Sequence, residues 1–155
     1  MRPTLVSGGI DTLAVDVLPM EPVPGSRFLL GDCTCVETQR AMLRDIGDQR
    51  LDLVLSDISP NRSGIKGHDH ARIISIFEEM LLLSRQCLRP GGSLVAKLLH
   101  GGELQKLMVA LREFSEPSLH KPPASRKESA EVYVVARNFD PIRFDKSAWL
   151  SNGLD

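Results

Sequence analysis

Three acidic residues lie at or just after the end of a short apolar run, where a strand would end. They are Asp16, Asp32 and Asp57. Ligands of open α/β sheets bind beyond the carboxyl ends of the strands, so these acids are candidates for binding. A carboxylate there can accept hydrogen bonds from both hydroxyls of a ribose, and we expect this role for Asp16. The alternatives are a solvated turn aspartate for Asp16 and an ordinary Gly-Asp turn for Asp32.

A lysine interrupts another apolar run. Lys97 separates Leu94-Val95-Ala96 from Leu98-Leu99 inside a segment that should be a buried strand. Lysine is rarely buried without a partner, and a buried lysine beside a carboxylate is a candidate functional pair. Asp57 could be that carboxylate, because the Ser59-Pro60-Asn61 turn that follows would hold it rigidly. The alternatives are an Asx-type turn at Asp57 and a lysine that snorkels to the strand end.

The remaining polar motifs are less specific. The segment 121–129, KPPASRKES, is either a phosphate-contacting loop or a solvated surface loop. Glu131 opens the last apolar run directly after it. The cysteines and histidines lack the spacing of a zinc site, and we predict no metal. The sequence contains no P-loop, GxSxG or HExxH pattern.

Alternating strand-like and helix-like patterns must position these residues. The expected strands cover residues 13–17, 28–30, 51–55, 93–99 and 131–136, and the expected helices cover residues 35–46, 69–89 and 102–115. Pro90-Gly91-Gly92 is predicted to end the second helix. Residues 117–130 are expected to be irregular, and residues 138–155 to form a loosely attached tail. Strands separated by helices imply an α/β fold with a mostly parallel sheet.

Length and composition describe an ordinary globular chain. The 155 residues suit a single domain, with 42% hydrophobic and 25% charged residues. These values exclude a disordered, collagen-like or coiled-coil chain. The net charge is −1, with acidic residues in excess before residue 60 and basic residues in excess after it. A polyanion should therefore meet the second part of the chain. No apolar run reaches the roughly 20 residues of a membrane span, and the odd number of cysteines suggests reduced intracellular thiols.

Four stretches together resemble the FtsJ-like (RrmJ) family of ribosomal RNA 2′-O-ribose methyltransferases. They are VDVLPMEPVPGSRFLLGD, LVLSDISPNRSG, LRPGGSLVAKLL and KPPASRKESAEVYVVA. They follow the family's order and spacing over most of residues 12–137, and the last looks most like the alphaproteobacterial and mitochondrial branch. The resemblance implies a Rossmann-like class I S-adenosylmethionine-dependent methyltransferase, here as one domain over residues 1–155.

The family's functional residues carry over to five positions. By resemblance, Asp57, Lys97 and Glu131 are catalytic, with Lys97 as the base that takes the hydroxyl proton. Asp16, Asp32 and Asp57 are the residues that would contact S-adenosylmethionine. The resemblance implies no metal.

The implied function is methylation of a ribose 2′-hydroxyl, of a uridine, in large-subunit ribosomal RNA, in support of ribosome biogenesis. The implied partner is ribosomal RNA or the large ribosomal subunit. We expect a monomer without membrane association, cytoplasmic in a bacterium and mitochondrial in a eukaryote.

The sequence also departs from the family. The first lysine of its Lys-Asp-Lys-Glu tetrad and its glycine-rich GxxPGGW loop have no counterpart, so we expect an N-terminally incomplete domain that binds the cofactor weakly. The alternative function is a non-catalytic RNA-binding or ribosome-assembly module on the same scaffold. A different Rossmann-like enzyme with a nucleotide cofactor would need a GxGxxG loop, which the sequence lacks.

Overall fold

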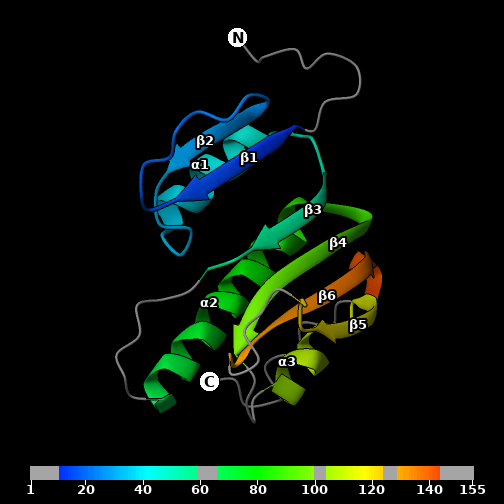
Figure 1. The fold of residues 1–155 in the computed structure, drawn as a ribbon. Coiled ribbons are helices and arrows are strands. Elements are labelled where there is room, and N and C mark those ends of the chain that lie inside the picture. The colour runs from blue at the N-terminus through cyan, green and yellow to red at the C-terminus, as the bar shows by residue number, and fades with distance from the viewer. Residues whose placement is uncertain (1–10, 59–65, 100–103, 124–128, 144–155) are drawn as a thin grey trace. The chain divides into compact units, whose positions relative to one another are not determined.

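The computed structural model describes residues 11–58, 66–99, 104–123 and 129–143. It divides into two compact units, Met1–Gln49 and Arg50–Asp155. The strands are β1 Thr12–Asp16, β2 Ser26–Leu30, β3 Leu51–Ser56, β4 Leu88–Leu99, β5 Phe114–His120 and β6 Glu131–Phe139. The helices are α1 Val36–Ile46, α2 Lys66–Cys87 and α3 Leu104–Ala110, and a 3-10 turn, Pro141–Arg143, follows β6. Both units combine helices with strands, so the expected α/β class is confirmed (Figure 1).

The first unit is a parallel strand pair with one helix. β1 and β2 pair in register from Thr12 opposite Ser26 to Asp16 opposite Leu30, so both strands end at the same edge. Arg27 of β2 forms ion pairs with Asp11, at 3.2 Å, and with Asp45 of α1, at 3.0 Å. These contacts tie the helix to the strand pair near the beginning of the two strands, whereas Asp16 and Asp32 lie at their carboxyl ends.

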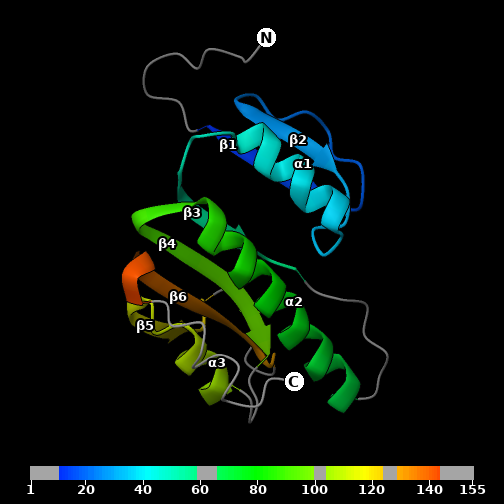
Figure 2. The ribbon, with the colours of Figure 1, turned by 180° about the vertical axis from the view of Figure 1, so that it is seen from behind.

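The second unit is a four-stranded sheet in the order β3-β4-β6-β5. β3 runs parallel to β4, whereas β6 is antiparallel to both β4 and β5. The view from behind shows α2 lying across the sheet (Figure 2). The sheet is therefore mixed: β3, β4 and β5 run in one direction, and β6 runs opposite to them between β4 and β5.

One face of this sheet carries the core. Alternate residues of β4 and β6 are buried there against side chains of α2 and α3. The buried strand residues are Leu94, Ala96, Leu98, Val132, Val134 and Ala136. Because successive strand residues point to opposite faces, Lys97, Glu131 and Tyr133 belong to the other face. That face, named here the open face, has half-buried positions along β4 and β6.

Two segments differ from the sequence-based expectation. Residues 114–120 form a strand, although the helix was expected to reach residue 115 and an irregular segment to follow residue 117. Pro117 argued against a strand in the sequence, because proline cannot donate a backbone hydrogen bond. Proline is tolerated in an edge strand, and β5 lies at the edge of the sheet with a register shift between Ser115 and Ser118. Pro90-Gly91-Gly92 is also part of β4, which begins at Leu88, with Gly91 at a φ of 78°.

The expected tail boundary at residue 138 was also wrong. β6 continues to Phe139, which is buried. Its ring lies against that of Phe114 with centroids 5.3 Å apart. The apolar pair closes the end of the β5–β6 ladder, so residues 138 and 139 belong to the sheet. The rest of the predicted tail, from residue 144, lies outside the described residues.

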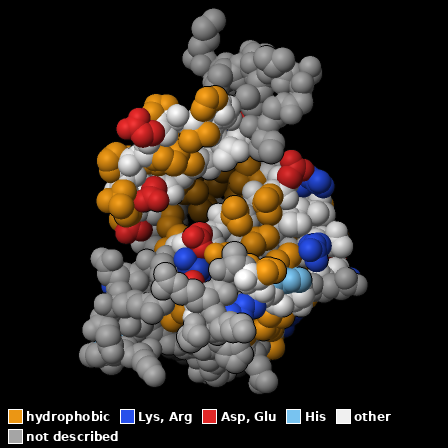
Figure 3. Space-filling model, viewed as in Figure 1, with side chains coloured by type: hydrophobic (Ala, Val, Ile, Leu, Met, Phe, Trp, Pro, Cys, Tyr) orange, Lys and Arg blue, Asp and Glu red, His pale blue; other side chains and the backbone are white. Residues whose placement is uncertain are grey.

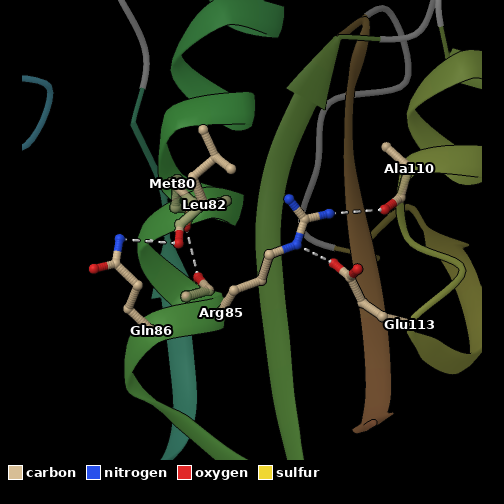
Figure 4. Close-up of polar contacts among 7 residues, drawn as sticks. Met80, Leu82, Arg85, Gln86, Ala110 and Glu113 are labelled. Carbon is tan, nitrogen blue, oxygen red and sulfur yellow. Dashed lines mark hydrogen bonds and ion pairs between the residues drawn. The ribbon is translucent and has the colours of Figure 1, made fainter. Parts of the chain in front are cut away.

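A buried ion pair joins α2 to the turn between α3 and β5 (Figure 4). Arg85 donates from Nε to Glu113 Oε1 at 2.6 Å and from Nη2 to the carbonyl of Ala110 at 3.5 Å. The Glu113 side chain is 1% exposed and that of Arg85 9%. Burial raises the pKa of Glu113, and the bond and charge of Arg85 oppose that rise. The pair therefore fastens α3 and β5 to the helix that covers the sheet.

Candidate active site

The structure brings Asp57 and Lys97 together. Asp57 directly follows β3, and Lys97 lies on β4 next to Ala96, which is the register partner of Ser56. Lys97 Nζ is 2.9 Å from Asp57 Oδ1, with side-chain exposures of 13% and 66%. The lysine is thus largely covered while its carboxylate partner remains open to solvent. Acidic and basic side chains meet among hydrophobic ones over the four-stranded sheet in the lower part of Figure 3.

Tyr133 completes this pair and was missed by sequence reasoning. It is the register partner of Lys97 on β6, and its hydroxyl donates to the same Asp57 Oδ1 at 2.8 Å. The hydrogen bond from Lys97 lowers the pKa of Asp57, burial opposes this, and the bond from Tyr133 lowers it further. The Asp57 carboxylate in turn raises the pKa of Tyr133, chiefly through the hydrogen bond. The available signal was the spacing from Glu131, because residues two apart share one face of a strand.

Replacing Tyr133 by phenylalanine should remove one donor from Asp57 and keep the ring in place. We expect the pKa of Asp57 to rise toward its ordinary value, because a hydrogen bond that favours the charged carboxylate is lost. A carboxyl NMR titration of the variant would measure this effect. An Asp57 titration that matches the unchanged protein would show that the hydroxyl does not hold this carboxylate.

Glu131 lies on the open face near these residues. It begins β6 opposite Leu99, and its backbone N–H donates to Ser129 Oγ at 3.2 Å. Its side chain is two positions from Tyr133 on the same face. The register therefore puts Glu131 on the same face of the sheet as Lys97 and Tyr133, at the start of β6.

The two acids of the first unit lie at adjacent strand ends. Asp16 Oδ1 accepts the N–H of Leu18 at 2.9 Å, and Asp32 Oδ1 accepts the N–H of Thr34 at 2.9 Å and its hydroxyl at 2.7 Å. Burial raises the pKa of the Cys33 thiol, and the charges of Asp32 and then Asp16 add to that rise. Both carboxylates thus act on one half-buried thiol, and both are exposed.

The carboxylate acceptors of the first unit, Asp16 and Asp32, fit a cofactor that carries hydroxyl and amine groups. Carboxylates accept hydrogen bonds from such groups. Gly31 precedes Asp32, and its N–H donates to the carbonyl of Asp16 at 2.8 Å. A Cβ at Gly31 would lie 2.6 Å from Thr38 Oγ1, so a residue with a side chain at this position would clash with the threonine. The two acids are therefore held by tight local geometry.

The structure describes only part of the residues on which the remaining predictions rest, those on metal binding, membrane spans and the basic segment 121–129. Within the described residues, no three His, Cys, Asp or Glu side chains are grouped to hold a metal. The helices that the structure describes include none long and apolar enough to cross a membrane. In the basic segment 121–129, Lys121 Nζ donates to the carbonyl of Ser129 at 2.9 Å, and residues 124–128 lie outside the described part of the chain.

A family model described as FtsJ-like methyltransferase matches residues 7–139. The chain belongs to this family. The resemblance drawn from the four sequence stretches is thereby confirmed, and the match includes all five residues assigned to the site.

Two curated relatives of this FtsJ-like protein carry the name Ribosomal RNA large subunit methyltransferase E. The relative from Granulibacter bethesdensis is 39% identical over 135 residues, covering 86% of this chain and 58% of the relative. The one from Gluconobacter oxydans is 41% identical over 143 residues, covering 91% and 53%. The chain thus spans a little over half the length of these relatives.

A solved structure supports the fold. A crystal structure from Plasmodium falciparum, described as that of a ribosomal RNA methyltransferase, superposes with a TM-score of 0.72 at 23% identity. The superposition covers 82% of this chain and 71% of that one. At this identity the likeness concerns the fold, and it agrees with a Rossmann-like α/β arrangement.

Proposed function

We propose that this FtsJ-like protein uses S-adenosylmethionine to methylate a ribose 2′-hydroxyl, that of a uridine, in large-subunit ribosomal RNA. The observation that carries the proposal is the shared carboxylate oxygen at the carboxyl end of β3, which receives both Lys97 and Tyr133. Parallel strands place ligand sites at this edge. The names of the relatives, which specify large-subunit ribosomal RNA, support the choice of substrate.

Each residue of the site has a role in this reaction. S-adenosylmethionine, when bound, supplies an electrophilic methyl group. Lys97 accepts the proton of the attacking 2′-hydroxyl, for which its amine must be in the neutral form. Asp57 fixes the position of the Lys97 nitrogen, and Glu131 orients the lysine or the ribose. Catalysis here consists mainly of alignment, because the methyl group is already activated.

The first unit provides the groups that recognise the cofactor. Asp16 accepts hydrogen bonds from ribose hydroxyls, and Asp32 accepts from the adenine amine. Both are exposed at neighbouring strand ends. We further propose that the protein acts as a monomer on ribosomal RNA or the large subunit in ribosome biogenesis. Its compartment would be the cytoplasm in a bacterium or the mitochondrion in a eukaryote.

The test is methyl transfer from labelled S-adenosylmethionine to large ribosomal subunits that lack the modification. A methylated 2′-oxygen blocks alkaline cleavage of the adjoining phosphodiester, so label should remain in an alkali-resistant dinucleotide. Label released in a mononucleotide would place the methyl group on a base and contradict the proposal. Binding of RNA without any transfer would favour the non-catalytic module.

Replacing Asp16 by alanine should weaken S-adenosylmethionine binding by about tenfold or more, because hydrogen bonds to a charged acceptor are lost. Calorimetric titration would measure the change. Asp48→Ala, in an exposed position after α1, is the matched control and should bind normally. Equal affinities of the two variants would remove Asp16 from the cofactor site.

A further inference from the structure

Three neighbouring strands align a row of polar side chains on the open face. Tyr133 of β6 is the register partner of Lys97 on β4 and of His120 on β5. Residues directly opposite in antiparallel strands have side chains on the same face. The row Lys97–Tyr133–His120 therefore crosses the sheet at right angles to the strands, away from Asp57.

His120 is the exposed outer end of this row. Its Nε2 is 3.0 Å from Ser118 Oγ, and that hydroxyl is also 3.4 Å from the carbonyl of Val135. The serine thus holds the histidine ring over β5. Lys121 follows, with its ammonium on the carbonyl of Ser129. Donor groups therefore gather at the β5 end of the row, whereas the exposed carboxylate of Asp57 lies at the other end.

We propose that single-stranded RNA follows this row and that His120 donates a hydrogen bond to a phosphate next to the methylated ribose. The inference rests on the proposed function, which puts the reacting hydroxyl at Lys97. Neighbouring strands are about 4.8 Å apart, so the backbones at His120 and Lys97 are separated by about 10 Å. That span is on the scale of one nucleotide with its flanking phosphate.

Charge determines which end of the row a phosphate of the RNA occupies, and the ring of Tyr133 determines where a base packs. A phosphate is repelled by the Asp57 carboxylate and attracted by donors, which favours the β5 end of the row. Between the two ends, the half-buried Tyr133 offers a ring beside the path. Unstacked bases of single-stranded RNA pack on such aromatic side chains. His120 therefore contributes to RNA affinity and position, with no part in the proton transfer.

The test compares His120→Ala with Arg89→Ala in the full chain. Arg89 is an exposed cation near the start of β4, paired with Asp52, and is the matched control. Binding of a fluorescent single-stranded oligoribonucleotide containing the target uridine would be followed by anisotropy. His120→Ala should weaken binding about tenfold and raise the KM for RNA with little change in kcat. Arg89→Ala should bind like the unchanged protein.

A charge-adding variant sharpens the result. His120→Arg should bind RNA at least as tightly as the unchanged protein, with a steeper salt dependence, by about 0.7 in the log–log slope. Equal binding of the His120 variants and the unchanged protein, with methyl transfer intact, would overturn this inference alone. Failure of the unchanged chain to bind RNA or transfer methyl groups would overturn the proposed function and this inference together.

Discussion

Replacement of Lys97 by methionine is expected to lower the rate of methyl transfer by about 10²–10⁴-fold, the usual cost of losing a general base. Methionine keeps much of the chain length and apolar volume of lysine and removes only the amine. The change should act on kcat, because the Asp16 and Asp32 strand ends are untouched.

Single-turnover assays would measure this loss of rate. Arg89→Met, near the opposite end of β4, removes an exposed cation from the same strand and should leave turnover unchanged. A thermal melt of both variants would separate loss of folding from loss of chemistry. Near-normal turnover in Lys97→Met would show that the lysine only supports the sheet.

Replacement of Arg85 by methionine should lower the free energy of unfolding by about 3–5 kcal/mol, because it leaves the buried Glu113 without its charged partner. Whole domains hold only about 5–15 kcal/mol, so the variant should be close to unfolding. Denaturant titration at neutral pH would measure the loss. The double variant Arg85→Met with Glu113→Leu removes both charges and should recover most of it.

The pH dependence of this variant has a definite sign. Burial already raises the pKa of Glu113 above its ordinary value of 4.5, and loss of Arg85 should raise it further. An acid with a raised folded-state pKa favours folding at low pH, and this contribution is lost as the pH rises through that pKa. Arg85→Met should therefore be less destabilised near pH 5 than at pH 8. An equal loss at both values would show that Glu113 is not the cause.

Apolar runs predicted five of the six strands that the structure describes, and in β4 and β6 alternate residues of those runs fill the core. β5 escaped detection, since an edge strand with a proline and few apolar residues has no such pattern. Pro90-Gly91-Gly92 was predicted to separate a helix from a strand. In the structure these residues lie within β4, where Gly91 adopts a positive φ.

The candidate site was predictable to a similar degree. An aspartate after a strand and a lysine inside another are visible as exceptions to their surroundings, and the two meet at 2.9 Å. Tyr133 is an ordinary strand residue by type, so only the antiparallel register of β6 reveals that its hydroxyl reaches Asp57. Strand direction depends on the path of the whole chain, and local pattern does not carry that information.

The contact between Tyr133 and Asp57 spans 76 positions of the chain. A contact between residues this far apart in the sequence carries a large entropic cost of loop closure, and we expect it to form late in folding. During synthesis, which proceeds from the N-terminus, β3 and β4 can pair before β6 exists, but the shared carboxylate cannot yet receive the tyrosine. The complete arrangement around Asp57 therefore arises only when nearly the whole sheet has been made, which couples maturation of the site to completion of the fold.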